Sequence, residues 1–384
     1  ETDSWLYNYS EEMKLKKRII ISVITVLILF IGVFAYQRHY MRVLTLSESD
    51  TESAVSGILP ISTNLGKINS SELVDVNEEL QKEAYSGAYV VSHNKRIVNS
   101  NQFGYANASD SLNFGFNTTT RVGNYQSIIN AVMLLRLLKQ QHKSVNTDLD
   151  SLVTELPSSK KLTASMILQG ETDFSIDNKR LVGLDSKRMA SEYFKQVKQA
   201  PASTLKSRQD ATNVLIVILI ERLSHKSYAN NVNEYLRESD LAGSRLITAD
   251  SKIGRQDGLT YGDRKNHTKV SDYRYPNKNI DQDYIIGIDQ LRMSMIDILN
   301  SVYLINKDRS FDKNYLIKYC KLMNYGGHIF TKQGKLSISS HGNNMSVVST
   351  RGGNNIVVVV DNYANRGTAK LPLAERIAQI SFKK

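Results

Sequence analysis

Cysteine is almost absent from this chain of 384 residues, and the single one, Cys320, excludes an intramolecular disulfide. A lone cysteine is more often a small buried apolar side chain than a catalytic thiol. The sequence also lacks Cys/His clusters with metal-ligand spacing and a glycine-rich phosphate loop, so we expect no metal and no cofactor. These absences argue against disulfide-stabilised, zinc-binding and P-loop proteins.

Acidic residues are scarce relative to basic ones, with 38 Asp and Glu against 49 Lys and Arg, a net charge of +11. Such a surface attracts polyanions over long distances. An unspecialised, solvated lysine surface is the alternative. Because residues 19–36 predict a membrane span that leaves the basic domain outside the cell, we expect teichoic acids and lipid head groups as partners rather than nucleic acid.

Charge is missing altogether from residues 19–36, IIISVITVLILFIGVFAY. At 1.5 Å per residue, a helix of this length spans most of a hydrocarbon core about 30 Å thick. Basic residues precede it at Lys14, Lys16, Lys17 and Arg18, and such clusters stay in the cytoplasm. A cleaved signal peptide is the alternative, but no small-x-small site follows. We therefore expect a cytoplasmic segment 1–18, a single transmembrane helix 19–41 in the cell membrane, and an exported C-terminal part. Export without disulfides favours a Gram-positive source.

Residues 42–77 are rich in Ser, Thr, Glu and Asn and show no helical periodicity. Segments of such low apolar density rarely order alone, which predicts an extracellular stalk. Glycosylation is another interpretation of the Ser/Thr density, although a plain spacer suffices. The domain proper is then expected over residues 78–384.

Within that domain, strand patterns occur near both ends and helical patterns in the middle. Residues 87–100 predict a β-hairpin that turns at residues 92–95. The remaining predictions are helices over 124–141, 162–168, 211–223, 281–305 and 371–380, and strands over 345–349 and 355–361. This order indicates an α+β fold in which terminal strands share one antiparallel sheet flanked by helices, with an all-helical subdomain.

Five segments, in order, give a family resemblance. They read FGYAN, NTTTRVGNYQSIINAVMLLRLL, LDSLVTELPSSKKLTASMIL, NVLIVILIERLSHKSYANNVNEYL and SHGNNMSVVSTRGGNNIVVVVDN. Together they resemble the serine β-lactamase and penicillin-binding-protein-like superfamily, in its esterase/class C-like branch. The resemblance implies a pocket with a Ser-x-x-Lys pair at the start of a buried helix, a Tyr-x-Asn loop and a Lys/His-x-Gly strand.

The chain departs from that pattern at each reactive position. Asn124 stands where the family has its nucleophilic serine, and Ser127 where it has its lysine. Arg208 and Asp210 match the tyrosine and asparagine of the loop, and His341-Gly342-Asn343 resembles an H-x-G variant. The resemblance implies that these residues line a ligand-binding pocket. Loss of a nucleophile and its base together removes nearly all acyl transfer in comparable catalytic units.

Serine and histidine side chains elsewhere in the chain are alternative reactive groups. Ser127 is either a relocated nucleophile or a capping residue in the first helical turn. Literal S-x-x-K strings begin at Ser92, Ser158 and Ser203, but none opens a predicted buried helix. His341 is either a pocket base or a structural histidine at a strand end.

Three functions follow from the resemblance. The first is a catalytically inactive, membrane-anchored domain that binds peptidoglycan, teichoic acid or an envelope protein. The second is an active serine-type hydrolase, such as a D-alanyl esterase or carboxypeptidase, with a non-standard nucleophile. The third is a scaffold whose pocket is filled.

Overall fold

A computed structural model describes residues 70–82, 85–108, 111–156, 161–198, 204–247, 257–259, 284–288, 290–323, 336–339, 345–350, 354–361 and 367–382. All of them belong to one compact unit, Ser62–Lys384. The predicted cytoplasmic segment, the predicted span 19–41 and residues 42–69 of the predicted stalk lie outside these ranges. Within them, no helix combines the length and the hydropathy that crossing a membrane requires.

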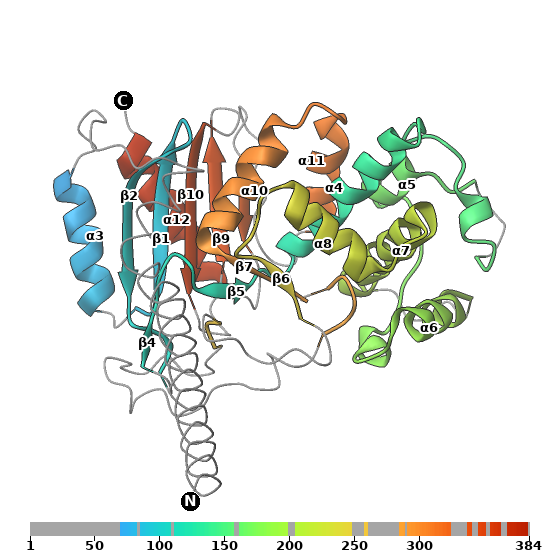
Figure 1. Cartoon of the computed structure of the whole chain (residues 1–384), viewed down its shortest axis with the longest axis horizontal. Coiled ribbons are helices and arrows are strands. Elements are labelled where there is room, and N and C mark those ends of the chain that lie inside the picture. The colour runs from blue at the N-terminus through green and yellow to red at the C-terminus, as the bar shows by residue number, and fades with distance from the viewer. Residues whose placement is uncertain are drawn as a thin grey trace, which may run out of the picture. The chain divides into compact units, whose positions relative to one another are not determined.

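Helices and strands follow the chain in this order (Figure 1): α3 Ser70–Lys82, β1 Gly87–His93, β2 Arg96–Phe103, β3 Tyr105–Asn107, β4 Leu112–Asn113, β5 Thr119–Arg121, α4 Tyr125–Gln140, η1 Asp150–Leu152, α5 Ala164–Gln169, η2 Asn178–Leu181, α6 Ser186–Lys198, α7 Leu205–Ser224, α8 Tyr228–Glu238, β6 Arg245–Leu246, β7 Leu291–Ser294, α10 Met295–Lys307, α11 Lys313–Leu322, β8 Leu336–Ser339, β9 Met345–Thr350, β10 Asn355–Asp361 and α12 Gly367–Phe382.

The main sheet joins the two ends of the domain, as the sequence predicted. Its strand order is β2-β1-β10-β9-β8, and every pairing is antiparallel. The predicted hairpin is confirmed: β1 and β2 are joined at Asn94 and Lys95, both with positive φ, at 48° and 66°. Two consecutive residues with positive φ make a type I′ turn, whose twist matches that of the paired strands.

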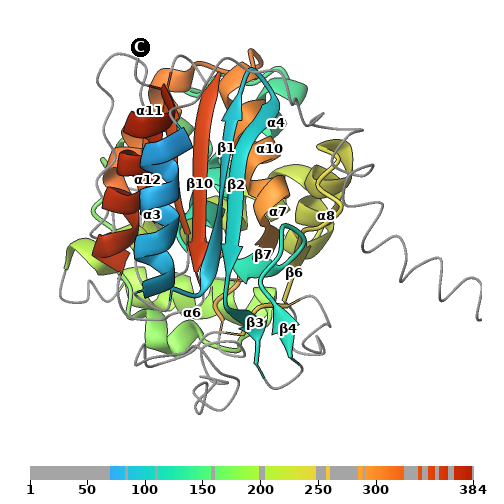
Figure 2. The ribbon, with the colours of Figure 1, turned by 90° about the vertical axis from the view of Figure 1, so that its left-hand side faces the viewer.

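Helices cover both faces of this sheet. In Figure 2, α3 and α12 lie on one face of β1, β2 and β10, and α10 lies on the other. The core between the sheet and the helices α3 and α12 contains Tyr89, Val91 and Val357 from the sheet and Leu73 and Ile377 from the helices. Because both faces are covered, β10 is buried at every position, which explains its unbroken apolar run.

Two sequence predictions need correction. The folded unit starts earlier than residue 78, because α3 begins at Ser70 and buries Leu73 and Val76 within the predicted stalk. The predicted helix 281–305 is also wrong at its start. Residues 291–294 form strand β7, which pairs with β5 and β6, and α10 starts only after its N-cap Ser294. Residues 291–294, Leu-Arg-Met-Ser, alternate apolar and polar residues over only four positions, which is too short a segment to separate a strand from the start of the following helix.

The remaining helices form the predicted all-helical part. Helix α4 packs on α7 and α11, and α7 packs in turn on α5, α6 and α8. Both α4 and α7 are buried around most of their circumference, as their apolar sequences predicted.

Candidate functional site

The start of helix α4 is where the resemblance places the reactive serine. Strand β5 leads into it, and Gly123, with φ of 52°, turns the chain between the two. The N-cap is Asn124, which is half-buried, and its side chain makes no capping hydrogen bond to the helix. The helix frame that the sequence predicted is therefore present, and a neutral amide stands at its head.

One turn later, Ser127 lies in the interior. It is 3% exposed and lies near the fully buried Tyr319 of α11, whose hydroxyl donates to Asn213 Oδ1 at 3.4 Å. Burial raises the pKa of Tyr319 well above its usual value, and the nearby Ser127 hydroxyl offsets only part of that. The phenol therefore keeps its proton at neutral pH and is no base for the Ser127 hydroxyl.

The neighbouring Cys320 is also interior. It is 2% exposed, and burial raises the pKa of its thiol to about 12. A thiol with such a pKa is protonated and unreactive at neutral pH, which fits the interpretation of Cys320 as an apolar core side chain.

Sequence reasoning missed a buried network of amides beside these residues. The hydroxyl of Tyr228 accepts from Gln126 Nε2 at 2.9 Å and donates to Asn130 Oδ1 at 2.6 Å. The amide of Asn130 then donates to Asn213 Oδ1 at 2.9 Å and to the Gly287 carbonyl at 2.9 Å. The network thus links α4, α7, α8 and the loop that leads to β7.

A second branch of the network fixes the start of β7. Gln126 Oε1 accepts from the backbone N–H groups of Gln290 and Leu291, at 2.7 and 2.9 Å. Asn213 donates to the same Gly287 carbonyl at 2.8 Å. The signal was available in the sequence, since amides at i and i+4 inside an apolar helix, as at 126 and 130, need buried partners.

Arg208 and Asp210 do not lie on a loop. Helix α7 starts with a capping box between Thr204 and Ser207, which makes residues 208–210 helical. Arg208 is exposed, whereas Asp210 is 2% exposed and accepts from Asn178 Nδ2 at 2.8 Å. Residues two apart on a helix point about 200° apart, so these two side chains do not face one pocket.

The third predicted element, His341, Gly342 and Asn343, lies outside the described residues, between β8 and β9. The structure therefore brings Ser127 against Tyr319, separates Arg208 from Asp210, and leaves the placement of the H-x-G segment a prediction. Across the described ranges, no group of His, Cys, Asp and Glu side chains has the arrangement of a metal site.

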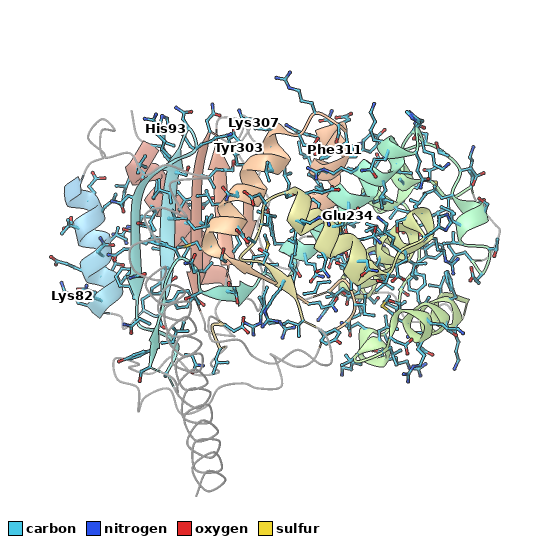
Figure 3. All side chains as sticks on the ribbon, viewed as in Figure 1. Lys82, His93, Glu234, Tyr303, Lys307 and Phe311 are labelled. Carbon is cyan, nitrogen blue, oxygen red and sulfur yellow. The ribbon has the colours of Figure 1, made fainter. Side chains whose placement is uncertain are left out.

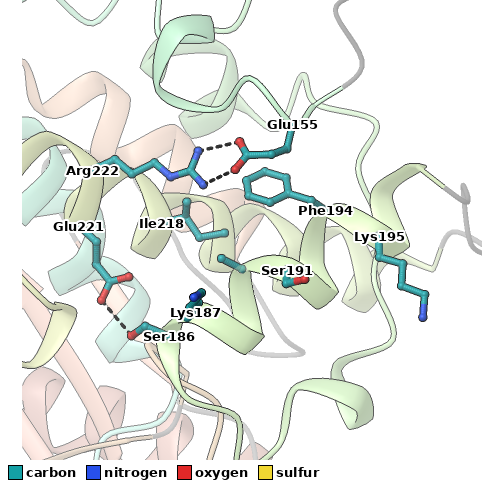
Figure 4. A pocket seen from close by; sticks show the side chains of 10 residues that line it. Glu155, Ser186, Lys187, Ser191, Phe194, Lys195, Ile218, Glu221 and Arg222 are labelled. Carbon is teal, nitrogen blue, oxygen red and sulfur yellow. Dashed lines mark hydrogen bonds and ion pairs between the residues drawn. The ribbon is translucent and has the colours of Figure 1, made fainter.

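A groove of about 770 Å³ lies between α6 and α7 (Figure 4). None of the predicted site residues lines it. Its floor contains Phe194 and Ile218. Arg222 closes one side with two bonds to Glu155, at 2.8 and 2.7 Å, and stacks on the Phe194 ring at 5.1 Å. On the other side, Glu221 accepts from Ser186 at 2.9 Å. Within this groove, Arg222 and Glu155 thus neutralise each other, and Glu221 is bound to a hydroxyl group.

A second, smaller groove of about 350 Å³ lies where α4 and α7 end beside α8. It is lined by Gln140, His225, Glu234 and Tyr235, among others. Glu234 is bound to Lys226 at 2.6 Å. Neither groove is lined by Asn124, Ser127, Arg208 or Asp210.

Comparison with known proteins defines the fold. No protein-family model and no curated protein sequence matches the chain. Solved structures do, and they show a serine β-lactamase/penicillin-binding-protein-like fold. The resemblance drawn from the five sequence segments is confirmed at this level.

Three of these structures illustrate the similarity. FmtA from Staphylococcus aureus is 14% identical with a TM-score of 0.59, over 85% of this chain and 95% of that one. A penicillin-binding protein from Bacillus halodurans is 13% identical, TM-score 0.55, over 78% and 98%. EstCE1, a hydrolase with promiscuous acyltransferase activity, is 12% identical, TM-score 0.61, over 81% and 98%.

Proposed function

We propose that this chain is a membrane-anchored, extracellular, penicillin-binding-protein-like domain without acyl-transfer activity that binds a component of the cell envelope. The observation that carries the proposal is the start of α4. There Asn124 and Ser127 replace the serine and lysine that the resemblance implies, and Ser127 is 3% exposed.

The chemistry of these side chains supports inactivity. An amide at position 124 is no nucleophile. The hydroxyl of Ser127 lies near the phenol of Tyr319, whose pKa burial raises well above its usual value, so this neighbour supplies no base. In a serine hydrolase, loss of one member of the catalytic unit already costs several orders of magnitude in kcat.

Charge and the predicted topology support an envelope ligand. The net charge of +11 favours anionic polymers, and the apolar segment 19–36 with its basic flank favours export of the domain. Teichoic acid or peptidoglycan is the proposed ligand, and an envelope protein is the other candidate partner. Of the predicted ligand-binding residues, His341, Gly342 and Asn343 remain proposed by family equivalence. Arg208 and Asp210 are not proposed as parts of one pocket, because they point to different sides of α7.

A second candidate function is a working hydrolase on cell-wall polymers. The names of similar structures favour it, since they include EstCE1, a hydrolase, and a β-lactamase/D-alanine carboxypeptidase from Pseudomonas syringae. Such an enzyme would need Ser127 or another residue as its nucleophile.

Covalent labelling separates the two. The full chain is incubated with a fluorescent penicillin and, separately, with a fluorescent fluorophosphonate, then denatured and resolved by electrophoresis. We expect no label on the chain while an active serine hydrolase in the same tube is labelled. Label that survives denaturation overturns the proposal, and its loss in Ser127→Ala would identify the nucleophile.

Binding is tested in parallel with purified cell-wall sacculi, before and after teichoic acid is removed. We expect the chain to co-sediment with intact walls. Loss of co-sedimentation after removal assigns the ligand to teichoic acid, and retention assigns it to peptidoglycan. No binding to either material would refute a wall-polymer role.

A further inference from the structure

Two lysines from distant parts of the chain meet on one tyrosine at the hairpin end of the main sheet. Lys95 Nζ lies 4.5 Å from the ring centroid of Tyr303, and Lys307 Nζ lies 5.8 Å from it. Figure 3 shows Tyr303 and Lys307 near His93, which precedes the turn. The ring attracts each ammonium, but the two ammonium groups repel each other.

The surroundings of this pair are basic. Lys95, Lys307 and Arg96, the first residue of β2, are exposed, and we call these three the basic patch. Lys307 also donates to Asn354 Oδ1 at 3.0 Å, which holds its ammonium at the surface. The adjacent carboxylate, Asp308, is directed to Arg136 at 2.8 Å. An anion that bridges the two ammonium groups would relieve their repulsion.

Lys95 is a costly residue for the fold at this position. Its φ of 66° lies in the left-handed region, at the second central position of a type I′ turn. Glycine is favoured there because a Cβ atom is strained in that conformation. Backbone conformation alone therefore favours Asn-Gly at this turn, whereas the lysine that stands here places its ammonium over the Tyr303 ring.

The patch lies at the end of the domain where the chain enters it. Helix α3 runs antiparallel to β1, since the Leu80 carbonyl accepts from Tyr85 N at 2.9 Å and Asn77 accepts from Tyr89 at 2.8 Å. Ser70 therefore lies toward the His93 end, and Lys82 lies at the opposite end, as Figure 3 shows.

With the membrane anchoring proposed above, on which this inference rests, the geometry identifies a ligand for the basic patch. The proposed stalk 42–69 has 28 residues, a length that limits the distance between the proposed span and the domain to at most about 90–100 Å. Such a tether holds the patch end of the domain near the bilayer at high effective concentration. We propose that the basic patch docks on the phosphate groups of anionic lipids, with the half-buried Tyr303 at the interface.

The experiment uses the full chain reconstituted into vesicles of phosphatidylcholine, with or without phosphatidylglycerol. A bimane is attached to Asn314→Cys, an exposed site beside Lys313, which binds the Asn306 carbonyl at the end of α10. A second preparation carries it on Lys82→Cys at the opposite end. Cys320 is buried and leaves the label specific. Lipids with nitroxide head groups report proximity by quenching.

We expect stronger quenching at residue 314 than at residue 82, only with phosphatidylglycerol, and weaker at high salt. The double variant Lys95→Gly/Lys307→Gln should lower the docked-to-undocked ratio by about fivefold for each charge removed. The matched control Lys187→Gln/Lys195→Gln removes two lysines from the α6 groove and should leave quenching unchanged.

Three other results would each refute the anchoring of the chain or the docking of the basic patch on lipid. A chain that does not float with the vesicles refutes the proposed anchoring and the docking with it. A chain that floats, yet is quenched equally at both sites or unaffected by the patch variant, refutes docking alone. If a soluble glycerol-phosphate polymer abolishes quenching at a phosphate concentration below that of the lipid, the patch binds the polymer instead.

Discussion

Replacing Tyr228 by phenylalanine tests whether the buried amide network stabilises the domain. The substitution keeps the ring and removes one hydroxyl group, which accepts from Gln126 and donates to Asn130. Both partners are interior, at 1% and 0% exposed, so water does not readily replace the lost bonds.

The magnitude follows from the two groups left without that partner. Each buried polar group that loses its hydrogen bond costs about 1–3 kcal/mol. Because the Gln126 amide also holds the start of β7, the two losses are coupled. We expect Tyr228→Phe to lower the free energy of unfolding by about 2–4 kcal/mol.

The assay is urea unfolding followed by circular dichroism, with Tyr193→Phe as the matched control. Tyr193 is fully buried, and its hydroxyl has no hydrogen-bond partner among the residues the structure describes. Burial raises the pKa of Tyr193, as it does for Tyr228. Removing this hydroxyl should be neutral or stabilise by up to about 1 kcal/mol. Equal effects of the two substitutions would refute the network argument.

Three further predictions concern single positions. Gly287→Ala should destabilise by about 3 kcal/mol or more, measured by urea unfolding, because its φ is 80° and a Cβ would lie 2.2 Å from Val217 Cγ2; a wild-type midpoint would contradict this. Burial raises the pKa of Asp297 from 3.8 to about 6, so the folded state keeps a proton that the unfolded state releases, and stability should fall as the pH rises through that window. Asp297→Asn should flatten this pH dependence in thermal unfolding, and an unchanged slope would assign it to other groups. Lys95→Gly should raise the free energy of unfolding by about 1 kcal/mol, and a loss of stability would show that the lysine serves the fold.

Local sequence patterns predicted most of the fold. The hairpin was predicted by two apolar runs around a polar turn, and one antiparallel sheet shared by the terminal strands by their places at the two ends of the domain, although the pairing of β1 with β10 itself was not predicted. The start of α4 was predicted to within one residue: the prediction was 124, and the helix begins at Tyr125 with Asn124 as its N-cap. Helix α3 was missed because polar residues dominate its exposed face, and only Leu73, Val76 and Leu80 pack inward.

The candidate site was harder to predict because its contacts are non-local. The position of Ser127 followed from the family frame, but its cover by Tyr319 depends on how α11 packs on α4. The loop expected at 208–210 is helical because Thr204 and Ser207 cap α7, so that the helix begins at Leu205 rather than at residue 211, where the apolar run begins. Capping residues were present in the sequence, so this error was avoidable.

The pairing of β1 with β10 has a consequence for synthesis. Gly87 pairs with Asp361, and β1 is flanked in the finished sheet by β2 and β10. At about 5–20 residues per second, the ribosome completes β10 roughly 15–50 s after β1. During that interval the β1–β2 hairpin is a two-stranded ribbon with an open apolar edge, which is marginally stable and prone to pairing with other chains. The domain thus closes only when its last strands arrive, and chains that end before residue 355 should be degraded or aggregate rather than accumulate as partly folded domains.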